Sequence, residues 1–425
     1  MKAHLVHFGC RLNQYESDAL GAGLGEQGIQ MTPSPEEADY IILNTCTVTN
    51  RADAKNRSSI RKMHDLNPAA RIVVTGCYAT TDAAEIATFP GVYKVVDNLN
   101  KARIPSLLAP TKQIADRENT EENMVDGQFG YSLRLKEGKK RAYLKLQDGC
   151  NKSCSYCKIP SARGPGRSRD FHDSLEEARH LIEAGFTELV LTGVNIGWYQ
   201  SNGYSFNELL KELLSLSGDF QIRVSSIEPG DVNAGFAEMF KHERMARFAH
   251  VPLQSGSKTI LKWMRRGYTP AHFRRNIEHL RSVVPDVHIG TDVIVGFPGE
   301  TEEMFQETLD FCAEMRFANI HVFPYSKRKN TAAVDWLREN SKEGIHEIPG
   351  NIIKERISRL IDLKTKMALD YAAECVNKKW WAIVEKGNQA LTENYLRVRL
   401  PDTREPGTRL QVKLLTADGE TAFLN

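Results

Sequence analysis

The sequence lacks the features of membrane-spanning and secreted proteins. None of its apolar runs approaches the length of about 18 uninterrupted residues that a transmembrane helix needs. Its first residues, MKAHLVHFGCRLNQYES, become polar within about ten positions and contain no small-residue cleavage site, so they do not form a secretory signal. We therefore expect a cytoplasmic protein.

An excess of charge of one sign is missing as well. The chain has 56 Lys and Arg against 54 Asp and Glu, a formal net charge of +2. This balance neither requires nor excludes a nucleic acid partner, so any basic face must be local. Eight cysteines in 425 residues without an export signal indicate reduced thiols or metal ligands rather than disulfides. The length predicts two or three domains.

Residues 1–110 alternate short apolar runs with helical stretches. The expected strands are 3–9, 39–46, 71–77 and 92–98, and the expected helices are 13–28, 50–66 and 79–88. This alternation predicts an α/β domain built on a doubly wound parallel sheet. Cys10, Cys46 and Cys77 each fall at the carboxyl end of a strand, the edge where open α/β sheets bind ligands. We expect the three cysteines to converge there, although single free cysteines are often plain core residues.

A polar linker at 111–135 precedes a second alternating region, residues 136–368. Its expected strands are 142–147, 187–193, 220–226, 248–253, 287–296 and 319–325. Six βα units predict a partial (β/α)6 barrel of the TIM type, with its active site at the carboxyl ends of the strands. Cys312 in a helix and Cys375 at a helix end are expected to pack in the interior.

Residues 369–425 alternate apolar and polar positions between turns. This pattern predicts a small antiparallel β-barrel. Arg397 and Arg399 share the polar face of one expected strand, which indicates either an RNA contact or an ordinary solvated face.

A C-x3-C-x2-C pattern, Cys150, Cys154 and Cys157, follows the first expected barrel strand. A structural zinc site closes with a fourth Cys or His. Residues 158–160 read Lys-Ile-Pro and offer no such ligand, and the next histidine, His172, lies beyond a polar stretch. Three cysteines on a [4Fe–4S] cluster leave one iron without a protein ligand. The pattern therefore predicts a cluster with an open iron rather than zinc.

The same spacing resembles the signature of radical S-adenosylmethionine (SAM) enzymes, in which the methionyl amine and carboxylate chelate the open iron. The wider set of motifs resembles the methylthiotransferase family over nearly the whole chain, including a terminal RNA-binding TRAM domain. These motifs are FGCRLNQYES, NTCTVTNRADAKNRSSIRK, VVTGCYA, GCNKSCSYCKIPSARGPGRSR, LTGVNIGWY, SSIEP, VPLQSGS and TDVIVGFPGET.

The resemblance implies a second [4Fe–4S] cluster on Cys10, Cys46 and Cys77. It also implies two SAM molecules for each product: one methylates a sulfur held at the second cluster, and the other yields the radical that abstracts an aromatic hydrogen. The implied partners are tRNA and an electron donor such as flavodoxin or ferredoxin, and we expect a monomer. No side chain beyond the cluster ligands is expected to be catalytic.

Further residues match the family's motifs. The resemblance implies that the backbone of Gly193 binds the methionyl amine, although a plain βα turn fits the same residues. Glu228 and Gln254 are expected either to bond the ribose hydroxyls or methionyl group of SAM, or to support residues that do.

Arg163, Arg167 and Arg169 follow the cysteine motif and are expected to contact RNA or SAM, or to form structural ion pairs. One departure concerns KRKNTAA (327–333), where Lys329 and Asn330 replace the Pro-Gly turn that is common in the family.

Tyr15 and Glu16 in GCRLNQYES resemble the subgroup that modifies N6-threonylcarbamoyladenosine beside the tRNA anticodon. The alternatives are the subgroups that act on N6-isopentenyladenosine of tRNA or on an aspartate of a ribosomal protein. A non-catalytic, metal-containing RNA-binding protein is the alternative from another functional class.

Overall fold

The computed structural model describes residues 1–109, 129, 141–339 and 342–423 of the chain. These residues form two compact units. The first contains the described part of 1–137 together with 147–152 and 157–169, and the second contains the described part of 138–146, 153–156 and 170–425. The predicted linker, 111–135, lies outside the described residues except for Phe129.

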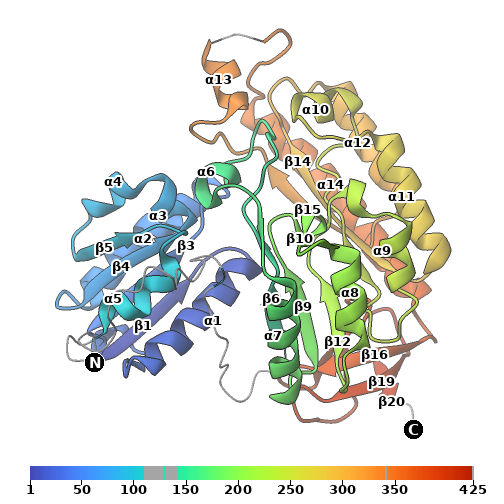
Figure 1. Cartoon of the computed structure of the whole chain (residues 1–425). Coiled ribbons are helices and arrows are strands. Elements are labelled where there is room, and N and C mark those ends of the chain that lie inside the picture. Colours follow the sequence, from blue (N-terminus) through green and yellow to red (C-terminus); the bar gives the residue numbers. More distant parts are fainter. Residues whose placement is uncertain (110–128, 130–140, 340–341, 424–425) are drawn as a thin grey trace. The chain divides into compact units, whose positions relative to one another are not determined.

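The first unit is built on a five-stranded parallel sheet of order β2-β1-β3-β4-β5, drawn in blue in Figure 1. Its strands are β1 (Lys2–His7), β2 (Gln30–Met31), β3 (Tyr40–Thr45), β4 (Arg71–Gly76) and β5 (Val92–Val96). The helices are α1 (Arg11–Glu26), α2 (Asn50–Leu66), α3 (Cys77–Thr81), α4 (Ala83–Ala87) and α5 (Ile104–Leu108). The four predicted strands are all present, and β2 is an additional short strand at the edge.

Both faces of this sheet are covered because successive side chains of a strand point to opposite sides. Ile41 and Leu43 of β3 pack in one apolar cluster with Ile60 of α2. Asn44 points the other way, toward α1, where its amide donates to the backbone carbonyl of Asn13 at 2.9 Å. The continuous run of buried residues in β3 therefore reflects helices on two sides, as the sequence predicted.

The first unit also includes part of the cysteine-rich segment. The antiparallel pair β7 (Gln147–Asp148) and β8 (Arg167–Ser168) brackets helix α6 (Ile159–Arg163). These residues group with the N-terminal sheet, although the sequence predicted them within a region that begins at residue 136.

The second unit contains two three-stranded parallel sheets, β12-β9-β6 and β13-β14-β15, linked by a parallel bridge between Ile222 and Met245. The strands are β6 (Arg141–Lys145), β9 (Glu188–Thr192), β12 (Gln221–Val224), β13 (Phe248–His250), β14 (His288–Val295) and β15 (Asn319–Pro324). The main helices are α7 (Phe171–Glu183), α8 (Phe206–Ser215), α9 (Ala234–Met239), α10 (Lys258–Trp263), α11 (Pro270–Val283), α12 (Glu302–Met315) and α13 (Ala332–Glu339). All six predicted strands are present.

The last part of the chain is a long helix followed by an antiparallel sheet, drawn in orange and red in Figure 1. Helix α14 (Gly350–Glu374) runs through the predicted boundary at 368/369. The sheet has the order β18-β17-β16-β19-β20, and a further bridge joins Arg399 to Glu420 at its two edges. Its strands are β16 (Lys379–Val384), β17 (Gln389–Thr392), β18 (Arg397–Arg399), β19 (Arg409–Leu414) and β20 (Thr421–Phe423).

The turn at Asn330 explains how asparagine can stand where the family that the sequence resembles commonly has glycine. Asn330 adopts a left-handed backbone conformation with φ of 62°. Asparagine tolerates this region better than most residues that carry a Cβ atom, so it can adopt this conformation in place of glycine.

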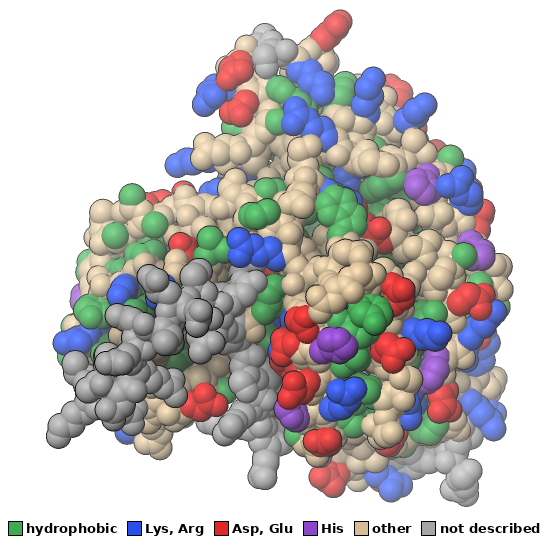
Figure 2. Space-filling model, viewed as in Figure 1, with side chains coloured by type: hydrophobic (Ala, Val, Ile, Leu, Met, Phe, Trp, Pro, Cys, Tyr) green, Lys and Arg blue, Asp and Glu red, His purple; other side chains and the backbone are tan. Residues whose placement is uncertain are grey.

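Two surface properties bear on function. Among the described helices, none is both long and apolar enough to cross a membrane. Figure 2 shows Lys and Arg side chains interspersed with Asp and Glu over the visible face of the second unit, in keeping with the near-neutral net charge.

Candidate active site

The structure brings Cys10, Cys46 and Cys77 together at one edge of the N-terminal sheet. Cys10 immediately precedes α1, Cys46 follows β3, and Cys77 is the first residue of α3. Strands β1, β3 and β4 are parallel neighbours, so their carboxyl ends meet. A Cβ atom built on Gly9, which has φ of +93°, would lie 2.6 Å from the Cβ and 2.7 Å from the Sγ of Cys46. Glycine is therefore required for this close approach.

The electrostatics of the three thiols fit a metal centre. Cys46 and Cys77 are buried, whereas Cys10 is exposed at the surface of the unit. Burial above all, together with the neighbouring thiols Cys77 and Cys10, raises the pKa of Cys46 to about 12, against a lowering by Arg163. Three thiolates are stable here only with cations among them, and metal ions supply these when a cluster is bound.

The number of ligands argues against a closed structural zinc site. Such a site takes four Cys or His ligands. The set that converges here among the described residues has three cysteines, which fits a [4Fe–4S] cluster with one iron left open.

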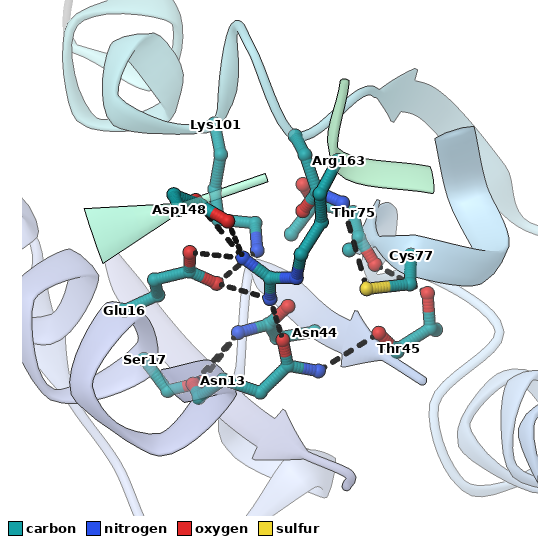
Figure 3. A network of polar contacts seen from close by, with 12 residues as sticks. Asn13, Glu16, Ser17, Asn44, Thr45, Thr75, Cys77, Lys101, Asp148 and Arg163 are labelled. Atoms are coloured by element: carbon teal, nitrogen blue, oxygen red, sulfur yellow. Dashed lines mark hydrogen bonds and ion pairs between the residues drawn. The ribbon is translucent and has the colours of Figure 1, made fainter. Parts of the chain in front are cut away.

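A buried network of charges lies beside these cysteines (Figure 3). The Arg163 guanidinium donates to Glu16 Oε1 at 2.9 Å, to Asp148 Oδ1 at 2.9 Å and to Asn13 Oδ1 at 2.5 Å. Lys101 Nζ pairs with Glu16 Oε2 at 2.5 Å. Two cations and two carboxylates, all at least 98 % buried, therefore balance one another inside the unit.

Two amides connect this network to the cysteines. Asn13, which accepts from Arg163, donates to the carbonyl oxygen of Thr45, the residue before Cys46, at 2.9 Å. Asn98 donates to Cys77 Sγ at 3.6 Å and to the carbonyl oxygen of Ala162 at 2.7 Å. Helix α6, which carries Arg163, is thus connected by hydrogen bonds to Cys77 and to the residue before Cys46.

The structure corrects the RNA contacts predicted for two arginines. Arg163 is 2 % exposed and engaged in the charge network, and Arg169 is 3 % exposed and donates to the Tyr15 hydroxyl at 3.3 Å. Both are buried, so they offer no surface on which to meet RNA; the structural ion pair is the correct reading for Arg163. Arg167 is exposed, and its predicted contact stays a prediction.

The cysteine motif is distributed over both units. Cys150 and Cys157 belong to the first, where the Cys150 amide donates to the carbonyl oxygen of Gly164 at 3.1 Å. The Lys152 and Ile159 amides each donate to a cysteine sulfur at 3.4 Å, to Cys150 and Cys157 respectively. Amide donors of this kind stabilise charge on sulfur, as a metal-bound thiolate requires.

Cys154 belongs to the second unit, where its sulfur accepts from Arg266 Nη1 at 3.3 Å. Arg266 Nη2 in turn pairs with Glu228 at 2.5 Å. Arg266 was not predicted from the sequence, where the consecutive arginines of MRRGYT, directly ahead of the residues that form α11, were an available signal. The pair is 5 % and 17 % exposed in its side chains, so Glu228 is partly accessible and fixed in orientation.

The other two predicted cofactor residues also lie at carboxyl ends of strands. Gly193 directly follows β9. Gln254, beyond β13, has φ of 66° and exchanges backbone hydrogen bonds with β14. Its amide donates to the Asp292 carbonyl at 2.8 Å, and its carbonyl accepts from the Ile294 amide at 3.0 Å. Their contacts with SAM stay predictions.

A second polar group was not foreseen. His250 Nε2 lies 3.1 Å and His321 Nδ1 lies 3.3 Å from the same oxygen of Asp292. These hydrogen bonds outweigh the effect of burial and hold the pKa of Asp292 below its ordinary value. We call these three residues the histidine–aspartate cluster. The available signal in the sequence was a polar residue within each of three successive apolar strands, β13, β14 and β15.

Arg397 and Arg399 share one exposed face of β18, as predicted. Their side chains are 66 % and 64 % exposed, and each lies near a carboxylate, Glu385 at 3.3 Å and Asp418 at 3.8 Å. Exposed pairs of this kind contribute little to stability, so both arginines are available to a polyanion.

Comparisons with known proteins place this arrangement in a family. The profile described as "Uncharacterized protein family UPF0004" matches residues 2–97, and "Radical SAM superfamily" matches residues 144–312. A Bacillus subtilis protein named "Threonylcarbamoyladenosine tRNA methylthiotransferase MtaB" is 37% identical over 96% of this chain and 92% of its own length. The chain belongs to the radical SAM methylthiotransferase family. It is accordingly a transferase whose chemistry uses SAM and iron–sulfur clusters.

Relatives in this family differ in the substrate that they are named for. An Aquifex aeolicus relative with the same name as the Bacillus protein is 34% identical over 97% of this chain and 100% of its own length. A Hydrogenobaculum relative named "tRNA-2-methylthio-N(6)-dimethylallyladenosine synthase" is 33% identical over 91% of this chain and 90% of its own.

The solved structures that resemble this methylthiotransferase support the fold. The Kitasatospora setae radical SAM methyltransferase TsrM, described with cobalamin and a [4Fe-4S] cluster bound, superposes with a TM-score of 0.58. It is 15% identical, and the match covers 85% of this chain and 90% of that one.

Proposed function

We propose that this methylthiotransferase inserts a methylthio group at carbon 2 of N6-threonylcarbamoyladenosine next to the anticodon of tRNA. The proposal includes two [4Fe–4S] clusters, one on Cys10, Cys46 and Cys77 and the other on Cys150, Cys154 and Cys157. It also includes two SAM molecules for each product, an electron donor such as flavodoxin or ferredoxin, and a monomeric enzyme.

The observation that carries this proposal is the convergence of three single cysteines, 36 and 31 residues apart in the chain, at one sheet edge. A radical SAM enzyme needs one cluster for SAM, so a second three-cysteine centre requires another role. When bound, the two clusters supply reductive cleavage of SAM and a site for the sulfur that is inserted.

The chain's own residues hold and orient these centres. Gly9 leaves room for Cys46, and Asn98 links Cys77 to Ala162 of helix α6. Arg266 aligns Cys154 with Glu228, which we propose as a hydrogen-bond acceptor for the ribose of SAM, with Gly193 and Gln254 contacting its methionyl group.

The finer architecture follows from the same reasoning. We propose that the six parallel strands of the second unit form a partial (β/α)6 barrel and that the C-terminal sheet forms a TRAM-like barrel. The bridges at Ile222 and Arg399 support closure of each. The exposed arginines of β18 would then meet tRNA phosphates, and binding would weaken steeply with salt.

The threonylcarbamoyl substrate is supported by Tyr15 and Glu16 and by the names of the Bacillus and Aquifex relatives. The second candidate is N6-isopentenyladenosine, because the Hydrogenobaculum relative, at 33% identity, is named for that type of substrate. A ribosomal aspartate remains the protein-modifying alternative.

Mass spectrometry of nucleosides from total tRNA tests the substrate. In a strain that lacks the gene, 2-methylthio-N6-threonylcarbamoyladenosine should disappear and its unthiolated precursor should accumulate. Re-expression of the wild-type chain should restore the product. If the 2-methylthio nucleoside with the isopentenyl group disappears instead, the proposed substrate is wrong and the enzyme is still a tRNA methylthiotransferase. If the tRNA nucleosides are unchanged, the ribosomal aspartate becomes the leading candidate substrate.

A further inference from the structure

The histidine–aspartate cluster lies on one face of the second sheet. In a parallel sheet, paired residues point to the same side. Gly290 pairs with His250, and Asp292 pairs with His321. The alternate residues of β14, Ile289, Thr291 and Val293, are at most 1 % exposed, so the cluster occupies the face opposite to the one that they bury.

Two features hold the cluster in place. A Cβ atom on Gly290 would lie 3.1 Å from His250 Nδ1, so the glycine lets the imidazole lie across β14 and reach Asp292. Asp292 accepts from both rings through a single oxygen, which fixes a proton on the facing nitrogen of each histidine. A bound metal would need those same nitrogens as lone-pair donors, so the hydrogen-bonded arrangement favours an organic ligand.

The face is open to a ligand at the cluster and at the next residue pair along the same face, Ile294 and Phe323. The His321 side chain is 49 % exposed and that of Asp292 is 24 % exposed. Phe323 follows on the same face of β15, opposite Ile294, and is 43 % exposed. Its ring lies 6.3 Å from that of His321 at 85°. An aromatic surface thus stands beside a polar one, with the aromatic nearer the carboxyl ends of the strands.

We propose that this face selects the substituent of the modified adenosine: Phe323 stacks on the purine, and the other ring nitrogen of His321, Nε2, accepts from the hydroxyl of the polar group carried on N6, with the ring oriented by Asp292 and His250. The ligand class is a purine with a carboxylate- and hydroxyl-bearing side chain, as threonylcarbamoyladenosine has. An apolar isopentenyl group could not hydrogen-bond His321, so the cluster would lose its bond to the substrate, which disfavours that substrate. This inference rests on the proposed function and assigns its specificity to particular residues.

The test uses the holoenzyme and two anticodon stem-loop RNAs that differ only in the adenosine substituent, threonylcarbamoyl or isopentenyl. Equilibrium binding and steady-state methylthiolation are measured for both. We expect His321→Phe to weaken binding of the threonylcarbamoyl RNA and raise its KM by about 2- to 10-fold, the effect of losing a hydrogen bond between neutral groups. Binding of the isopentenyl RNA should be unchanged or tighter.

Three further variants complete the design. Asp292→Asn should lower the preference for the threonylcarbamoyl RNA over the isopentenyl RNA, because it releases His321. Phe323→Ala should weaken the binding of both RNAs equally, because stacking does not depend on the substituent. His279→Phe, at an exposed position of α11, is the matched control and should leave the preference unaltered. Thermal melting checks that each variant is folded.

The outcomes separate the two proposals. If the wild-type enzyme modifies neither RNA, the proposed function is wrong. If it modifies the threonylcarbamoyl RNA but His321→Phe and Asp292→Asn keep the wild-type preference, only the present inference is wrong. A stoichiometric divalent ion that is present in wild type and absent from Asp292→Asn would assign the cluster to a metal and overturn it as well.

Discussion

Replacement of Arg163 by methionine should destabilise the first unit strongly. The guanidinium bonds Glu16, Asp148 and Asn13 while its side chain is 1 % exposed. Methionine keeps much of the length and removes the charge, which leaves two carboxylates opposite the single cation Lys101. Loss of one partner from a buried ion pair costs about 3–5 kcal/mol, a large part of the stability of a typical domain.

Amide hydrogen exchange measures this loss locally, without assuming that a two-unit chain unfolds in one step. The slowest amides of α1 should exchange about 150- to 5000-fold faster in Arg163→Met, the equivalent of that energy. Arg167→Met, at an exposed position in the same segment, is the control and should change the opening free energy by less than about 0.5 kcal/mol.

A second replacement tests the electrostatic cause. Adding Asp148→Asn to Arg163→Met removes one charge of each sign and should recover part of the lost protection, because the two sites are coupled. An acceleration below about 5-fold in Arg163→Met, or additive effects in the double variant, would refute the view that charge balance holds this unit together.

Other perturbations probe other parts of the molecule. Cys77→Ser should remove about half of the iron and abolish methylthiolation while SAM cleavage persists, whereas Cys312→Ala, in the core of α12, should keep the wild-type iron content. Burial lowers the pKa of His288 to about 3, from an unfolded value near 6.5, so stability present above pH 6.5 is lost as the pH falls. Unfolding free energy should drop by about 2 kcal/mol between pH 7 and pH 5, and His288→Phe should flatten this dependence in denaturant titrations at each pH. Arg397→Gln and Arg399→Gln should each weaken tRNA binding in filter assays and reduce the slope of log affinity against log salt by about 1, and an unchanged slope would exclude a phosphate contact.

The order of strands and the meeting of Cys10, Cys46 and Cys77 were predictable because both follow from short-range patterns. Buried parallel strands appear as continuous apolar runs, and a residue just after each run must lie at the same sheet edge. The cysteines needed no contact information beyond that rule.

The role of Arg163 was not predictable in this way. Its partners Glu16 and Asp148 lie 147 and 15 positions away, and the segment SARGPGRSR presents three arginines of equal appearance. Only the tertiary structure decides which of them is buried, because a buried arginine requires carboxylates supplied by distant elements.

The histidine–aspartate cluster depended on strand register. His250, Asp292 and His321 each stand inside an apolar run that was interpreted simply as a strand. A shift of one residue in pairing would send any of these side chains to the opposite face, so their meeting could not be derived before the register was known.

The composition of the first unit has a consequence for protein synthesis. The last helix of its sheet ends at Leu108, yet Asp148 and Arg163, which complete the buried network of Glu16 and Lys101, follow 40 and 55 residues later. At a translation rate of about 5–20 residues per second, the nascent sheet waits about 3–11 seconds for Arg163. During that interval Glu16 is paired with Lys101 alone, and the Asn13 side-chain oxygen and both Glu16 oxygens lack the donors that Arg163 supplies. Fragments cut after the sheet would remain in this unfinished state permanently, so a separately expressed N-terminal domain should include residues 147–169 to become fully ordered.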